Sequence, residues 1–173
     1  MNNTRWVLLA GMVLVAALCR VIPHPPNFTP LAALALFGGA TFSDKRAALA
    51  IPLAALLLSD LAIGYHPDPI VYLSFALIVC LGFLLQNRRS VARVAAGTLA
   101  GAIAFFVLTN FGVWLTTPMY AKTLAGLATC YVAAIPFFGN TLSSDILYSA
   151  LLFGCLALVE RRWPALSEPL PAT

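Results

Sequence analysis

Side chains that could do chemistry are few in this sequence, and their spacing limits what they could do. Its four cysteines show no CxxC pairing, which argues against a zinc site or a disulfide framework. Its two histidines lie in proline-rich stretches, and the sequence contains no GxSxG, HExxH or P-loop motif. We therefore expect no catalytic residues and no ATP site in this chain. Ligand binding by isolated thiols, amides and carboxylates is the chemistry that remains.

Membrane helices must position these groups. Of the 173 residues, 61% are hydrophobic and 9% are charged, whereas soluble domains contain roughly 45–50% apolar and 25% charged residues. The net charge of +4 is spread along the chain without a basic stripe, so we expect no nucleic-acid partner. The composition predicts an all-α, polytopic membrane protein whose solvent is the lipid bilayer.

Prolines and charged turns divide the apolar sequence into six segments. We expect helices over residues 6–22, 31–42, 47–65, 70–86, 91–114 and 141–159, which together form one transmembrane domain over 1–173. A membrane span needs about 20 apolar residues, and the second segment is short by this measure. The prediction is a six-helix transmembrane bundle.

The distribution of Lys and Arg predicts how this bundle is oriented. Basic residues accumulate on the cytoplasmic side of short loops. With six spans and both termini in the cytoplasm, only Arg20 and Lys122 fall on the outer side, and the other eight bases fall inside: Arg5, Lys45, Arg46, Arg88, Arg89, Arg93, Arg161 and Arg162.

The stretch 116–140 is too apolar for a solvated linker, and prolines and glycines interrupt it. Irregular backbone at membrane depth must be buried in protein or line a cavity, so we expect a long, partly inserted outer loop between the fifth and sixth helices, acting as a lid over a pocket. The aromatic side chains in and before this stretch would also suit the belt of Trp and Tyr that membrane proteins place at the membrane–water interface. The predicted pocket wall consists of Asn110, Trp114, Tyr120, Tyr131, Phe137, Phe138 and Asn140.

Further candidate ligand-binding residues lie in the shorter outer loops or near the outer ends of helices. Ionisable groups within membrane spans are functional candidates by default, which favours Asp60 and Asp145. Each also has a structural alternative, because Asp60 could pair with Arg20 and Asp145 could cap the sixth helix. The outer loops contribute His24, Asn27, His66 and Asp68.

This arrangement resembles the S components of energy-coupling-factor (ECF) vitamin transporters. The resemblance depends on the architecture and on three sequence features: PHPPNFTP at 23–30, the pair Ser59 and Asp60, and the segments TNFGVWLTTPMY and CYVAAIPFFGN. The chain's size and mid-chain cysteine are most similar to the solitary, cobalamin-specific BtuM type. The resemblance implies a multi-pass protein of the bacterial cytoplasmic membrane that takes up vitamin B12.

In that family a cysteine thiolate is the axial ligand of the cobalt in bound cobalamin. This role transfers best to Cys80, with Cys130 in reserve. Because a strong sulfur donor weakens the ligand on the opposite face of cobalt, removal of cyanide from cyanocobalamin would follow. The first helix lacks the AxxxA pattern that often docks S components to a shared ECF module, since Leu14 follows Ala10. The resemblance implies two partners, the vitamin and such a module. A solitary protein that binds no module also fits.

Three alternatives stay open at the level of sequence. The chain could be an S component for a different vitamin. It could be a small membrane scaffold or assembly subunit that docks through the stripe of small residues from Ala92 to Ala104. It could also be a membrane enzyme that uses His24, His66 and Asp68.

Overall fold

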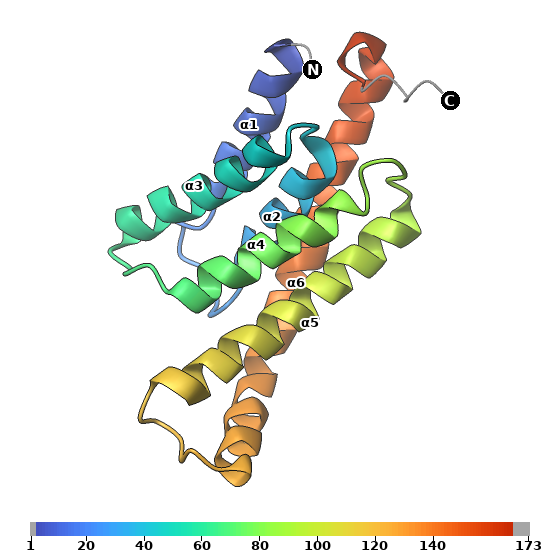
Figure 1. Cartoon of the computed structure of the whole chain (residues 1–173). Helices are drawn as coiled ribbons and strands as arrows, with labels where there is room; N and C mark the ends of the chain where they lie inside the picture. The colour runs from blue at the N-terminus through green and yellow to red at the C-terminus, as the bar shows by residue number, and fades with distance from the viewer. Residues whose placement is uncertain (1–2, 168–173) are drawn as a thin grey trace.

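The computed structural model describes residues 3–167, which form six α-helices and, within this range, no β-strand (Figure 1). The predicted all-α class is confirmed, and the predicted helix ends lie within four residues of the observed ends at every boundary except the start of the sixth helix. The helices are α1 (Asn3–Leu18), α2 (Leu31–Thr41), α3 (Lys45–Ile63), α4 (Pro69–Phe83), α5 (Val91–Thr116) and α6 (Leu124–Arg162), followed by the short 3₁₀ helix η1 (Pro164–Leu166).

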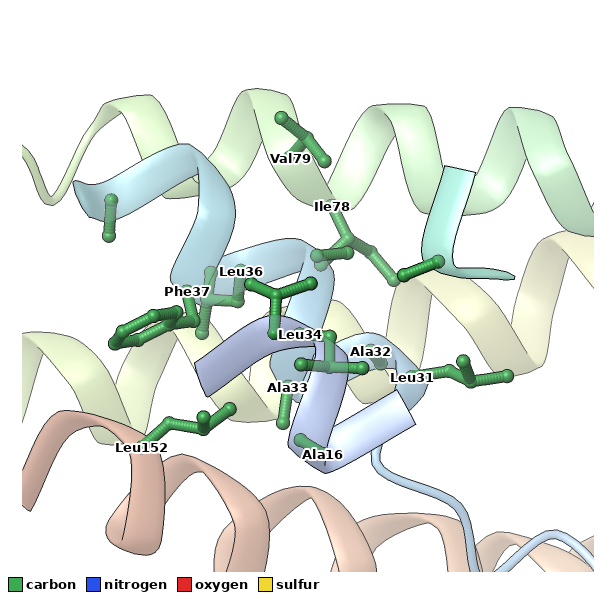
Figure 2. Close-up of a cluster of buried hydrophobic side chains, with 14 of the residues drawn as sticks. Ala16, Leu31, Ala32, Ala33, Leu34, Leu36, Phe37, Ile78, Val79 and Leu152 are labelled. Carbon is green, nitrogen blue, oxygen red and sulfur yellow. The ribbon is translucent and has the colours of Figure 1, made fainter. Parts of the chain in front are cut away.

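The shortest α-helix, α2, is the centre of the fold. All its residues from Leu31 to Thr41 are buried, and it packs against each of the other five helices. Figure 2 shows its side chains between those of Ile78 and Val79 on α4 and that of Leu152 on α6. A helix that is apolar on every side must be buried on every side, and here protein covers it. Its 11 residues rise about 16 Å, which is about half the thickness of the hydrocarbon core of a bilayer. This explains why the second predicted segment is short for a membrane span.

Two glycines allow α2 to approach α4 closely. A Cβ atom added at Gly39 would lie 2.9 Å from the Gly82 Cα and closer still to the Val79 carbonyl oxygen. A Cβ atom added at Gly82 would lie 2.8 Å from the Gly39 Cα. The two backbones are therefore in direct contact, as small residues permit where membrane helices cross.

Three of the helices, α3, α5 and α6, are long and apolar enough to cross a membrane. The other three are shorter apolar helices of 16, 11 and 15 residues. The structure therefore supports a helical membrane protein, and spanning by all six helices stays a prediction.

The helices alternate in direction, so their connections gather at two ends of the molecule. At one end, which we call the terminal end, Glu160 near the end of α6 accepts hydrogen bonds from Arg5 on α1 (2.8 Å) and from Arg89 before α5 (3.3 Å). Gln86 donates there to the carbonyl oxygens of Gly39 and Phe42, both at 2.9 Å. The opposite end contains the α1–α2 and α3–α4 connections, and we call it the cavity end.

The prediction of a long loop between the fifth and sixth helices is wrong. The structure continues α6 back to Leu124, so the connection is short and α5 and α6 form a helical hairpin (Figure 1). Thr123 is the N-cap, and its hydroxyl accepts a hydrogen bond from the Gly126 N–H at 3.1 Å. Pro136 removes only one backbone donor from a helix of 39 residues, and packing against α5 outweighs that loss.

Candidate ligand-binding cavity

A cavity of about 650 Å³ opens at the cavity end of the bundle. This volume lies within the range of roughly 300–1,000 Å³ that is usual for small-molecule sites. Its wall combines the α1–α2 connection with residues of α2, α3, α4, α5 and α6. The lining residues are Arg20, Val21, Ile22, Pro23, His24, Pro26, Asn27, Thr29, Leu31, Ala32, Ile63, Tyr65, Val71, Phe75, Phe105, Thr141 and Asp145.

Asp145 is the buried acid of this cavity, with 2% of its surface exposed. The prediction that it could cap the sixth helix is wrong, because α6 begins 21 residues earlier, at Leu124. Its carboxylate instead interacts with the backbone N–H of Ala33, in the first turn of α2. Pro30, the N-cap residue of α2, makes no side-chain cap, so Asp145 places a carboxyl group from another helix beside the uncapped N-terminus of α2.

Asp60 forms the ion pair with Arg20 that the sequence offers as its structural role. The guanidinium group of Arg20 contacts the Asp60 carboxylate and also donates to the Ser59 hydroxyl at 2.9 Å. The Tyr72 hydroxyl donates to the second Asp60 oxygen at 2.8 Å. This network ties the end of α1 to α3 and α4, and Arg20 forms part of the cavity wall with its charge already paired.

The α1–α2 connection forms the mouth of the cavity and contributes the predicted residues His24 and Asn27. The His24 Nδ1 atom lies 2.9 Å from the Pro25 carbonyl oxygen, so this nitrogen carries the proton and donates. Asn27 adopts a left-handed backbone conformation (φ 60°), which Asn tolerates better than most residues. Asn140 of α6 donates to the Pro26 carbonyl oxygen at 3.0 Å and fastens the connection to the bundle.

The aromatic residues predicted to form the lid hold α5 against α6 instead. Phe106 packs on Tyr131 and on Phe138, with ring centroids 5.7 and 5.0 Å apart. The Trp114 indole N–H donates to the Ala121 carbonyl oxygen at 2.9 Å, and the Asn110 side chain donates to its own helix at the Phe106 carbonyl oxygen. These residues, together with Tyr120 and Phe137, are absent from the cavity wall within the described part of the chain.

The cysteines also lie away from the cavity. Cys80 and Cys155 are exposed, Cys19 is half-buried, and Cys130 is buried with its thiol 3.4 Å from the Asn110 carbonyl oxygen. None of the four lines the cavity formed by residues 3–167. In the same range, no three His, Cys, Asp or Glu side chains are grouped as a metal site would need.

The two remaining predicted residues lie in the α3–α4 connection. Asp68 is the N-cap of α4, and its carboxylate accepts from the Ile70 N–H at 2.8 Å. His66 is exposed in the same turn, and neither residue is part of the cavity wall.

Several lining residues carry no signal in the sequence. Phe75 and Phe105 pack against each other, with ring centroids 5.3 Å apart, and look like any apolar residues of their helices. Thr141 and Tyr65 are equally ordinary by type. Arg20 is the exception, because a cation at the end of an apolar segment indicates a buried partner.

Comparison with known proteins identifies a family and nothing more specific. No curated protein and no solved structure matches the chain. The resemblance to ECF S components therefore stays a prediction. Residues 1–166 match a family described as a family of unknown function, DUF6580, and the chain belongs to that family.

Proposed function

We propose that this protein is a membrane-embedded binding component that takes a small organic molecule into its cavity for uptake. The observation that carries the proposal is the cavity of about 650 Å³ at one end of a helical membrane protein. Its walls come from the α1–α2 connection and from residues of α2, α3, α4, α5 and α6, so a ligand there would contact five of the six helices.

The charge distribution supports access to the cavity from outside the cell. Basic side chains are concentrated at the terminal end, where Arg5 and Arg89 meet Glu160. Eight of the ten Lys and Arg residues belong to this end, and the rule that basic loops stay in the cytoplasm supports a cavity on the outer side. A solute arriving from outside would meet the cavity first.

The size of the cavity favours a ligand of ordinary metabolite size. Cobalamin through Cys80 is a second candidate, and the exposed thiol of that residue is the observation that favours it. A corrin held by Cys80 would bind on the outer surface of α4 and not in the cavity. An absorbance spectrum with added cobalamin tests this candidate, because Cys80→Ala should abolish any altered spectrum while Cys130→Ala leaves it unchanged.

The experiment for the cavity is native mass spectrometry of the protein purified in mild detergent. The wild type should release a co-purified small molecule. Thr29→Trp, which fills the cavity from the α1–α2 connection, should lose it. Val132→Trp, on the exposed face of the α5–α6 hairpin, is the matched control and should retain it. A wild type with no bound molecule, or equal occupancy in both variants, would contradict the proposal.

A further inference from the structure

The Asp145 carboxylate has one oxygen whose hydrogen bonding is incomplete. The backbone N–H of Ala33 interacts with this side chain, yet no donor among residues 3–167 reaches Oδ2, which is fully buried. A buried carboxylate oxygen without a donor is costly, because it has lost water and gained nothing in exchange. Since Asp145 lines the cavity, a group that enters the cavity can donate a hydrogen bond to this carboxylate.

Three polar residues in the cavity wall have partners elsewhere. Arg20 is paired with Asp60 and Ser59, and the proton on His24 Nδ1 faces the Pro25 carbonyl oxygen. On α6 itself, the Thr141 hydroxyl donates to the Phe137 carbonyl oxygen at 3.3 Å. The Asp145 carboxyl group therefore has no cation of its own in the described part of the wall.

Much of the remaining wall is apolar. Leu31 and Ala32 of α2, Val71 and Phe75 of α4, and Phe105 of α5 line the cavity together with Asp145. Such a wall binds the hydrocarbon or aromatic body of a ligand and excludes water from the acid. Exclusion of water strengthens a charge-assisted hydrogen bond between the acid and a cationic donor.

We propose that the ligand of this cavity is an organic amine, with an apolar or aromatic body against Phe75 and Phe105 and a protonated nitrogen that donates to the Asp145 carboxylate. This inference rests on the proposed function and names its substrate class. An acid paired by its ligand also explains why the fold keeps a carboxylate at this depth, where an amide could cap α2 equally well.

The test compares probes that share one aromatic body. Tryptamine, its neutral alcohol analogue indole-3-ethanol and the anionic indole-3-acetate are titrated by calorimetry into the full-length protein in lipid nanodiscs. The wild type should bind tryptamine about tenfold or more tightly than the alcohol, and it should bind the acetate most weakly. The reason is that losing a charge-assisted hydrogen bond lowers binding affinity by at least about tenfold.

The variant Asp145→Asn should bind tryptamine and the alcohol with affinities within about twofold of each other, because the charge that distinguishes them is gone. An amide oxygen can still accept from the Ala33 N–H, so the cap on α2 survives and the variant should fold. Asp68→Asn is the matched control: it changes an acid at the same end that lies outside the cavity wall, and the preference for tryptamine should persist.

The outcomes separate the two proposals. Equal binding of the amine and the alcohol by the wild type would overturn the amine inference while leaving a cavity that binds small molecules. An unchanged preference in Asp145→Asn would also overturn it. If none of the three probes binds, the amine inference fails, and the mass-spectrometric experiment decides the proposed function independently. Should Asp145→Asn not fold, the affinity order of the three probes on the wild type still decides the inference.

Discussion

The contact between α2 and α4 makes a quantitative prediction for Gly39→Ala. The added methyl group would lie 2.9 Å from the Gly82 Cα and closer still to the Val79 carbonyl oxygen, whereas ordinary contacts begin at about 3.4 Å. Both obstacles are backbone, so no side chain can rotate away, and the helices must separate by about 1 Å or more. A gap of roughly 0.5–1 Å forfeits a quarter to a half of the dispersion energy of each contact along the crossing.

The expected cost follows from two opposing terms. Overpacking of a close contact destabilises by about 3 kcal/mol when backbone must move. Replacing Gly by Ala inside a helix returns about 1 kcal/mol through helix propensity. The net loss for Gly39→Ala is therefore about 2 kcal/mol, which for a chain of this length lowers the midpoint of thermal unfolding by about 4–8 °C.

Thermal unfolding followed by tryptophan fluorescence in detergent measures this shift. Gly154→Ala on α6 is the control, because nothing lies within 4 Å of the added methyl group and only the helix-propensity gain applies. Its midpoint should be unchanged or slightly higher. Gly39→Ala together with Gly82→Ala should cost less than the sum of the two single changes, since helices already separated accommodate the second methyl group. Equal midpoints for Gly39→Ala and Gly154→Ala would refute the reasoning.

Three further predictions concern the network at the cavity end, the hairpin and the orientation. Asp60→Asn leaves a buried guanidinium group without its counter-charge and should cost about 3 kcal/mol in the free energy of unfolding, against about 1 kcal/mol for Tyr72→Phe, as chemical denaturation would show. Thr123→Ala removes the N-cap of α6 and should speed hydrogen exchange in its first turns, with the rest of α6 unaffected. A cysteine placed at Ser90 of a cysteine-free chain should react with an impermeant maleimide only in inverted vesicles, and one at Met119 only in right-side-out vesicles; the reverse pattern would invert the proposed orientation.

Sequence patterns predict most of the helices but not the one long element that decides the shape of the molecule. Prolines and charged turns mark the ends of the first five helices within a few residues. Pro136 and Gly126 weigh against a helix by local propensity, and this signal is misleading for 124–140. The contacts of Phe106 with Tyr131 and Phe138 show what overrides it: tertiary packing between two helices that are distant in sequence.

For the candidate site, ionisable residues could be predicted and apolar walls could not. Asp145 and Asp60 stand out because acids are rare in membrane helices, and both prove to be buried. Their partners are less predictable: the Arg20 pair follows from opposite charges at neighbouring helix ends, but the link from Asp145 to Ala33 requires knowing how α6 crosses α2. Cys80 illustrates the opposite error, because its depth in α4 is readable from sequence while the direction in which it points is not.

The cavity and the buried acid both follow from the shortness of α2. With 11 residues and about 16 Å of rise, α2 reaches the terminal end at Thr41 but starts well inside the bundle at Leu31, so the irregular α1–α2 connection has to occupy the remaining depth. Backbone of this kind packs less densely than a helix, and the space it leaves is the cavity, whose wall contains eight residues of that connection. Starting inside the bundle also buries the N-terminal N–H groups of α2 where water is scarce, which requires an acceptor from another helix. Asp145 is that acceptor, and it lines the space that the short helix creates.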